Sequence, residues 1–218
     1  MIRLLPALAL FFVLLVAAPA FAQSGKDIQL PAVSALAGVD LYDALRGRES
    51  LRAFDSKELA LQDLGDVLWA ANGQKTPGGK WIIPFARRTD PTFRVYVTGK
   101  DGTYLYQGSE HKLSYVHNRD LRASVALQDF VAEAPVVLIF VVDPSPLRSK
   151  ALNQPLEEVL YTIYLSCGAS MQDIYLVAAA KHMATCFIGS IKHGDWEDGL
   201  VKEGEAYYGC MPLGYAVR

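Results

Sequence analysis

Three arginines and one serine lie close together near residue 50, a combination of side chains suited to binding a phosphate group. Within "RGRESLRAF" (residues 46–54), Arg46, Arg48 and Arg52 surround Ser50. A guanidinium group can donate two parallel hydrogen bonds to an oxyanion, and a serine hydroxyl adds a further donor. If the segment is extended, Arg48, Ser50 and Arg52 point to the same side, because side chains alternate along extended backbone.

A second interpretation of the same segment involves no ligand. Surface arginines often pair with nearby carboxylates, and Asp43, Glu49 and Asp55 lie close in sequence. The chain contains neither G-x-x-x-x-G-K-[ST] nor G-x-G-x-x-G, so nothing supports a nucleotide site of those types. The sequence alone leaves the phosphate site and the solvated surface segment both open.

Length and composition are typical of one sizeable domain. The chain has 218 residues, a formal net charge of −2 and 51% hydrophobic residues, so it can bury a core without disulfides. The nearly neutral charge gives no reason to expect nucleic acid as a partner. The histidines show no metal-ligand spacing, and no metal site is predicted.

The N-terminus has the pattern of a cleavable signal peptide. Arg3 precedes a long apolar run that ends in the small-residue pattern "AFA", which predicts a signal peptide over residues 1–22 and a mature start near Gln23. Pro6 and Pro19 interrupt the run and argue against a membrane anchor. We therefore expect export to the periplasm or secretion, with no membrane span after cleavage.

The three cysteines are predicted to be small buried hydrophobic residues. Cys167, Cys186 and Cys210 form no C-x-x-C motif, and an odd number leaves at least one thiol unpaired. A bridge between Cys186 and Cys210 stays open, because spacing does not decide it.

Hydrophobic spacing predicts an N-terminal arm at residues 23–36, then one domain over 37–218 with an α+β order of elements. The expected helices are 37–46, 61–72, 119–132, 155–181 and 195–203, and the expected strands are 93–99, 103–107, 135–143 and 207–218. Residues 184–191 are expected to form a strand or a loop. The strand at 135–143 is apolar on every side, so it should be central and covered on both faces. The helix at 155–181 has a thin polar face, which predicts burial between layers or against a second subunit.

Several segments, in order, resemble the nitroreductase family of FMN-dependent oxidoreductases. They are "RGRESLRAF", "LQDLGDVLWAANG", "GASMQDIYLVAAAKHMATCFIG" and "MPLGYA". The resemblance extends over about 40–216, and the most similar branch is that of small proteins akin to thiazole/oxazole-forming (azoline) dehydrogenases. It implies a nitroreductase-like α+β fold with a central mixed or antiparallel sheet flanked by helices, and a long buried central helix. It also implies a homodimer with FMN at the interface.

The family's R-R-S-x-R phosphate segment corresponds to residues 48–52. The resemblance therefore implies that Arg48, Ser50 and Arg52 hold the phosphate and ribityl chain of FMN. Glu49 stands where the family has a second arginine, and its carboxylate would repel a phosphate unless it points away.

The family's P-S-x-x-N-x-Q-P stretch, which contacts the edge of the flavin ring, corresponds to residues 84–91. The resemblance places Pro84, Ala86 and Arg88 among the cofactor-binding residues. Phe85 replaces the family's serine and Arg88 replaces its asparagine, so two interpretations stand. Either Arg88 stabilises charge on the reduced ring, or the loop no longer contacts flavin.

The long helix and the strand after it supply the remaining expected contacts. Gln172 matches the family's central helix, and Ile188, Gly189 and Ser190 correspond to the segment whose backbone amides face flavin N5 and O4. The alternative is that Gly189 is an ordinary strand glycine. His182 stands where the family has a glycine cap, so it should adopt a left-handed φ unless the helix ends differently.

The resemblance implies two-electron (hydride) transfer through FMN between a small-molecule donor and an acceptor that use the same pocket in turn. No side-chain acid or base is obligatory, so no catalytic side chain is assigned. NAD(P)H, the usual reductant of the family, is scarce outside the cytoplasm, and the donor stays open. Two alternatives remain: a flavin-binding protein without turnover, and an interaction protein that has kept only the fold.

Overall fold

The computed structural model describes residues 25–34, 39–85, 90–148 and 155–217. The predicted signal peptide at 1–22 lies outside these ranges, as do Ala86 and Arg88. In the described ranges, no helix has both the length and the apolar character needed to cross a membrane.

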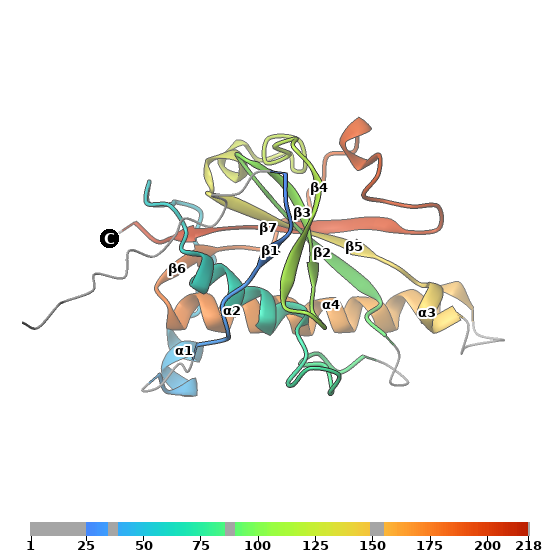
Figure 1. Cartoon of the computed structure of the whole chain (residues 1–218), viewed down its shortest axis with the longest axis horizontal. Helices are drawn as coiled ribbons and strands as arrows, with labels where there is room; N and C mark the ends of the chain where they lie inside the picture. Colours follow the sequence, from blue (N-terminus) through green and yellow to red (C-terminus); the bar gives the residue numbers. More distant parts are fainter. Residues whose placement is uncertain (1–24, 35–38, 86–89, 149–154, 218) are drawn as a thin grey trace, which may run out of the picture.

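A seven-stranded sheet forms the centre of the molecule (Figure 1). Its strands are β1 (Ile28–Gln29), β2 (Phe93–Gly99), β3 (Gly102–Gln107), β4 (Lys112–His117), β5 (Val136–Val142), β6 (Met183–Thr185) and β7 (Ala206–Tyr215). Their order is β1-β4-β3-β2-β5-β7-β6, and every neighbouring pair is antiparallel. The predicted α+β fold with a central sheet is confirmed.

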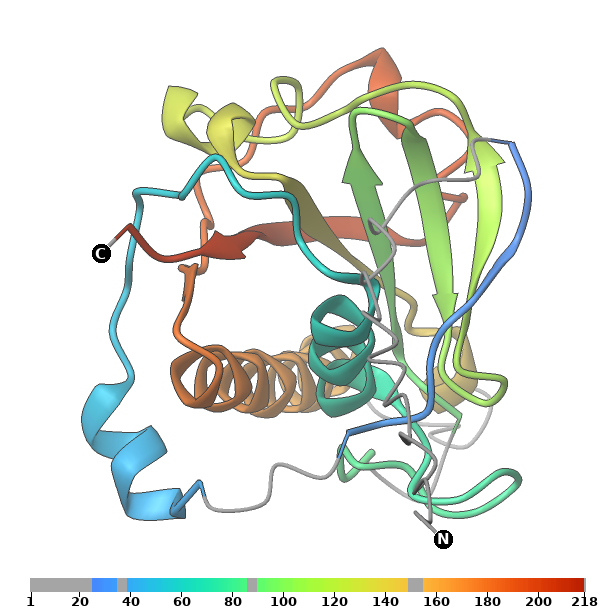
Figure 2. The same ribbon diagram turned by 60° about the vertical axis from the view of Figure 1, so that its left-hand side comes forward.

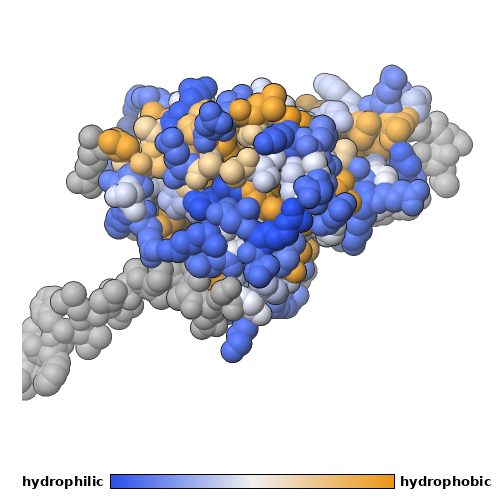
Figure 3. Space-filling model, turned by 90° about the horizontal axis from the view of Figure 1, so that it is seen from above, coloured by the Kyte–Doolittle hydropathy of each residue, from blue (hydrophilic) through white to orange (hydrophobic). Residues whose placement is uncertain are grey.

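Helices and irregular segments cover the two faces of the sheet. The helices are α1 (Leu41–Gly47), α2 (Leu61–Asn72), α3 (Ser145–Arg148) and α4 (Leu156–Ala180), with short 3₁₀ helices at Asp129–Glu133 and Asp195–Glu197. Figure 2 shows α2 and α4 side by side along one face. Segments 119–134 and 186–205 lie over the other face. In the view from above, hydrophobic side chains appear as separate patches among hydrophilic ones (Figure 3).

β5 lies between two hydrophobic cores, as its continuous apolar sequence predicts. All seven of its residues are buried. Val136, Leu138, Phe140 and Val142 pack on the side of α2 and α4, and Val137, Ile139 and Val141 pack on the opposite side. Because side chains alternate between the two faces along a strand, β5 contributes residues to both cores.

The ends of the two long helices follow the sequence signals. α2 ends at Gly73, whose N–H donates to the carbonyl of Trp69 at 2.8 Å. α4 ends at Lys181, and the next residue, His182, has a φ of +54°. The predicted left-handed conformation of His182 is confirmed, because the chain must reverse there to enter β6.

The prediction of a helix at 119–132 is wrong. This segment consists of turns, and only Asp129–Glu133 forms a 3₁₀ turn. Leu121 donates its N–H to Thr98 Oγ1, and Leu127 donates its N–H to the carbonyl of Ser190. Because these groups bond to distant segments, they are not available for a helical ladder.

The helix predicted at 195–203 is also shorter than expected, since it spans only Asp195–Glu197. β4 is a strand that the apolar pattern does not single out.

All three cysteines are free and buried, as predicted, and Cys186 and Cys210 form no bridge. Cys167 lies in the core under α4, whereas Cys186 and Cys210 lie in the core on the opposite face of the sheet. Burial raises the pKa of the Cys167 thiol to about 12 and that of Cys210 to about 11.

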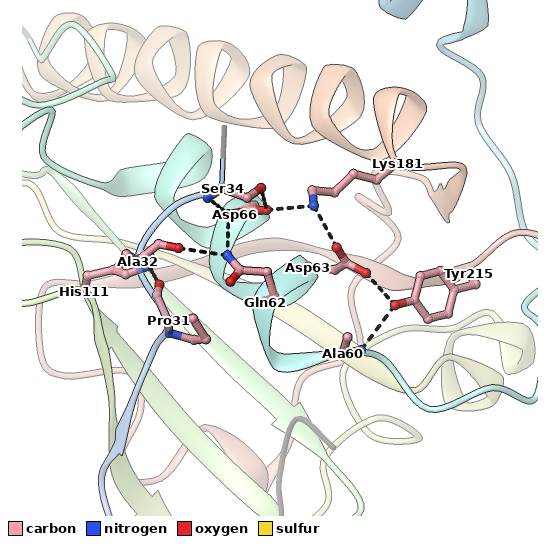
Figure 4. Close-up of polar contacts among 10 residues, drawn as sticks. All are labelled: Pro31, Ala32, Ser34, Ala60, Gln62, Asp63, Asp66, His111, Lys181 and Tyr215. Atoms are coloured by element: carbon pink, nitrogen blue, oxygen red, sulfur yellow. Dashed lines mark hydrogen bonds and ion pairs between the residues drawn. The ribbon is translucent and has the colours of Figure 1, made fainter. Parts of the chain in front are cut away.

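A buried ion cluster at the end of α4 joins the helices to each other (Figure 4). Lys181 Nζ lies 2.7 Å from Asp63 Oδ1 and 2.7 Å from Asp66 Oδ2, and both aspartates belong to α2. Asp63 also accepts a 2.5 Å hydrogen bond from the hydroxyl of Tyr215 in β7. Asp66 accepts the N–H and the hydroxyl of Ser34 from the N-terminal arm. The cluster therefore connects four parts of the chain: the end of α4, α2, β7 and the N-terminal arm.

The charges of this cluster stabilise one another. Burial alone would raise the pKa of Asp66, but hydrogen bonds from Lys181 and Ser34 outweigh it and hold the pKa below its usual value. Burial would lower the pKa of Lys181, but the two carboxylates outweigh it and raise the pKa. The cluster therefore stabilises the fold at neutral pH. Its contribution is lost as the pH falls through the pKa of Asp66 in the folded state.

We predict that Lys181→Met lowers the free energy of unfolding by about 3–5 kcal/mol, because it leaves the buried Asp66 carboxylate without its cation. Lys75→Met is the control, since Lys75 is exposed and forms no ion pair with any described residue, and it should change stability by less than about 0.5 kcal/mol. Urea unfolding at pH 7 measures both. Equal stability of the two variants would contradict the role given to Lys181.

Candidate functional site

The arginine segment lies beside the chain that leaves β6. The N–H of Leu51 donates to the carbonyl of Thr185 at 3.1 Å. Farther along, the N–H of Asp55 donates to the carbonyl of Tyr215 at 2.9 Å. Arg48 has an extended conformation, with φ −68° and ψ 114°. Two regions far apart in sequence are thereby placed next to each other.

Tyr175, on α4, lies between these two regions. Its hydroxyl accepts a 2.8 Å hydrogen bond from the N–H of Phe187 and lies 3.2 Å from Ser50 Oγ. The guanidinium carbon of Arg48 is 5.3 Å from the centre of the Tyr175 ring. The sequence alone did not indicate this role, because the apolar spacing of the helix also fits a core position for Tyr175. The signal in the sequence was a tyrosine hydroxyl within the apolar face of the helix.

The arginines differ in their partners. Arg46 pairs with Asp43 at 3.0 Å on the exposed surface of α1. Within the described residues, Arg48 and Arg52 have no carboxylate partner, and Arg52 Nη1 donates to the carbonyl of Ser50 at 3.2 Å. Within the described residues, the carboxylate pairing expected of a solvated segment therefore occurs at Arg46 and not at Arg48 or Arg52. Two cations and a hydroxyl remain available for an anion.

Unpaired backbone donors lie on the neighbouring segment. Ile188 is buried and exchanges hydrogen bonds of 2.8 and 3.1 Å with Cys210 in β7. Gly189 and Ser190, which follow, are exposed. Among the described residues, the N–H groups of Gly189 and Ser190 have no hydrogen-bond partner. Gly189 is therefore not an ordinary strand glycine, since its N–H lies outside the sheet ladder.

A stack of three aromatic rings supports this segment. The ring of Tyr208 lies 4.9 Å from that of Tyr164 at an interplanar angle of 12°, and 5.8 Å from that of Phe187 at 30°. The stack joins α4 and β7 to the residue that comes just before Ile188. It fixes the backbone from which the free N–H groups project.

Only the ends of the loop at 84–91 belong to the described residues. Pro84 is exposed, and Ala86 and Arg88 lie outside the described residues. Phe85 is buried, with ring distances of 5.5 Å to Phe93 and 6.2 Å to Trp81, so the phenylalanine that replaces the family's serine is a core residue. In the described part of the chain, no hydrogen bond or ring contact joins Pro84 or Phe85 to the arginine segment.

Two other expected residues lie near the site without contacts to it. Gln172 is exposed on α4, three residues before Tyr175, which places both on one side of the helix. Glu49 is exposed and forms no ion pair with any described residue. Its carboxylate therefore does not pair with either of the two free arginines.

Comparison with known proteins identifies the family. The model of the nitroreductase family matches residues 45–215, which include both the arginine segment and the Gly189 segment. The chain belongs to the nitroreductase family. It is 26% identical over 202 residues to MJ1384 of Methanocaldococcus jannaschii, a protein assigned to the nitroreductases, covering 88% of this chain and 98% of that one.

Solved structures agree with this assignment. A Ralstonia eutropha JMP134 protein assigned to the nitroreductases has a TM-score of 0.80 and 28% identity, covering 94% of this chain and 96% of its own. A nitroreductase from Desulfovibrio desulfuricans, solved in complex with FMN, has a TM-score of 0.53 and 15% identity, covering 83% and 88%. At that identity the likeness concerns the fold alone. Membership of the family supports a flavin-dependent oxidoreductase.

We predict that Gly209→Ala destabilises the protein by about 2 kcal/mol, because Gly209 has a φ of +155° and an added Cβ would lie 2.6 Å from Phe187 Cε2 and 2.7 Å from the carbonyl of Ile188. In Gly189→Ala the Cβ comes only to 3.4 Å of the same ring, so that variant should keep normal stability. Urea unfolding compares the two, and a fully stable Gly209→Ala protein would contradict the packing described.

Proposed function

We propose that the protein is an exported FMN-dependent oxidoreductase that transfers two electrons, as a hydride, between small molecules at a homodimer interface. One observation carries the proposal. Arg48 and Arg52, which have no carboxylate partner in the described chain, lie with Ser50 next to the segment that bears the unpaired N–H groups of Gly189 and Ser190.

The arginine segment suits the phosphate end of FMN. Arg48 is half-buried and Arg52 exposed, so both guanidinium groups can reach an anion at the surface. Ser50 adds a hydroxyl, and the exposed Glu49 forms no ion pair with either arginine. A phosphate dianion would supply the negative charge that these residues lack.

The Gly189 segment suits the flavin ring. Unpaired N–H groups on a rigid backbone stabilise negative charge that develops on a neighbouring atom, because the donors are already in place and need not rearrange. FMN, when bound, supplies the two-electron chemistry. The chain's own residues hold the phosphate, orient the ring and present the N–H of Gly189, and none of them need exchange a proton.

The outer surface of α4 supports a homodimer, which is typical of nitroreductases. Tyr161, Leu165, Gly168 and Gln172 form an exposed stripe at helical spacing, and the side chain of Leu165 is 58% exposed. A Cβ built on Gly168 would meet nothing within 4 Å, so the stripe is open in the single chain. We infer that a second copy covers it and brings its 84–91 loop to the flavin.

Export rests on the signal-like N-terminus, and a place in the azoline dehydrogenase branch rests on the sequence resemblance. Both are proposals. If the protein is exported, the electron donor is a small molecule available outside the cytoplasm, and NAD(P)H is then a poor candidate.

We predict that Arg48→Ala and Arg52→Ala each weaken FMN binding about tenfold or more, since a charged hydrogen bond is worth roughly 1.5–3 kcal/mol. Arg46→Ala is the matched control, because Arg46 already pairs with Asp43, and it should bind FMN normally. Calorimetric titration of the apoprotein measures all three. Wild-type protein that takes up no FMN would leave the interaction protein as the remaining interpretation. Bound FMN that no donor reduces would favour a flavin-binding protein without turnover.

We also predict that Leu165→Glu produces a monomer that has lost most of its FMN affinity, because a charge would replace an apolar contact at the dimer interface. Leu127→Glu is the control. Leu127 is 66% exposed but lies in the loop before Asp129–Glu133, away from α4, so this variant should remain a dimer. Light scattering and FMN titration give the two readouts, and a monomeric wild-type protein with full FMN affinity would refute the interface site.

A further inference from the structure

The two ends of the proposed FMN site come from segments that are distant in sequence, and a single side chain bonds to both. The hydroxyl of Tyr175 contacts Ser50 at the phosphate end and the N–H of Phe187 at the ring end. We propose that Tyr175 is a positioning residue that couples phosphate binding to the placement of the Gly189 N–H. This inference rests on the proposed function and adds to it a link between the two ends of the site.

The hydroxyl of Tyr175 accepts from the N–H of Phe187, and either hydroxyl can donate in its 3.2 Å contact with Ser50 Oγ. An anion bound at Ser50 selects the arrangement in which Tyr175 donates, because Ser50 then needs its own hydrogen for the anion. Ser50 can then donate its hydroxyl hydrogen to an anion. The chain of donors runs from Phe187 through Tyr175 and Ser50 to the phosphate, and an anion at its end strengthens each bond in it, because aligned hydrogen bonds polarise one another.

The ring of Tyr175 adds a second contact to the phosphate end. The guanidinium of Arg48 lies over the ring at 5.3 Å, a distance suited to a cation–π interaction. A ring face holds the cation without a carboxylate partner, so the N–H groups of Arg48 stay available for an anion. Tyr175 thus positions two of the proposed phosphate ligands, Ser50 and Arg48.

At the ring end, Phe187 has few ways to move. Its side chain stacks on Tyr208, and the next residue, Ile188, is bonded in both directions to Cys210. A side chain of α4, that of Tyr175, bonds to the backbone of this short segment at the N–H of Phe187. Loss of the Tyr175 hydroxyl would therefore remove the link between α4 and this backbone, two residues before Gly189, while the ring stack and the bonds to Cys210 remain.

The test compares Tyr175→Phe, which keeps the ring and removes the hydroxyl, with Tyr164→Phe. Tyr164 is on the same helix, its ring also stacks on a neighbour, and its hydroxyl has no hydrogen bond to any described residue. We expect Tyr175→Phe to weaken FMN binding roughly 3- to 10-fold. The reduction potential of bound FMN should become more negative, because the N–H that favours the reduced ring is less firmly held. Tyr164→Phe should match the wild type in both measurements.

Coupling also predicts an effect that a purely local role for Ser50 excludes. Ser50→Ala changes only the phosphate end, yet it should shift the potential of bound FMN in the same direction as Tyr175→Phe, whereas Arg46→Ala should not. The double variant Ser50→Ala/Tyr175→Phe should bind FMN no more weakly than the worse single variant. Riboflavin, which lacks the phosphate, should distinguish wild type from Tyr175→Phe less than FMN does.

The outcomes separate this inference from the proposed function. Wild-type protein that binds no FMN would overturn both. If wild type binds FMN but Ser50→Ala and Tyr175→Phe leave the potential unchanged, or their effects on affinity add, the coupling is refuted and the FMN site stands. The Ser50→Ala measurement decides the question even if Tyr175→Phe does not fold.

Discussion

The ion cluster of Lys181 with Asp63 and Asp66 joins the C-terminal end of α4 to α2 and, through the two carboxylates, to β7 and the N-terminal arm. Helix packing alone allows a helix to slide along its neighbour, but a buried cation held at 2.7 Å by two carboxylates of α2 allows little displacement. Through Asp63 the same cluster holds Tyr215 of β7, and through Asp66 it holds the arm at Ser34. The end of α4 is therefore fixed in register with the sheet.

The candidate site depends on the position of α4, because its residues come from several segments of the chain and not from one helix or strand. The arginine segment is irregular, and the Gly189 segment lies beyond the end of β6. They come together because one pairs with Thr185 and Tyr215 while the other pairs with Cys210, and because α4 supplies Tyr175 between them. A rigid scaffold with short irregular segments at its edge is a common way to present binding groups to a ligand.

The sequence predicted most of what local chemistry determines. The strand at 93–99 and the strand through Phe140 follow from β-branched and apolar runs, which are local properties, whereas the left-handed turn at His182 was expected from the glycine cap that the family has at this position. The helix predicted at 119–132 failed because its backbone groups bond to residues distant in sequence, such as Ser190. The role of Tyr175 was overlooked for the same reason. The spacing of apolar residues predicts which face of a helix a side chain lies on, but not which distant group its hydroxyl bonds to.

The distribution of the cysteines gives the molecule its own reporters of internal motion. Cys167 lies in the core under α4, and Cys186 and Cys210 lie in the core on the opposite face of the sheet. Burial raises the pKa of each thiol, so all three are protonated at neutral pH and therefore unreactive. An alkylating reagent can label Cys167 only when α4 lifts from the sheet, and Cys186 or Cys210 only when the other layer opens. The labelling rate of each thiol thus measures how often its own layer opens, and no additional cysteine has to be introduced.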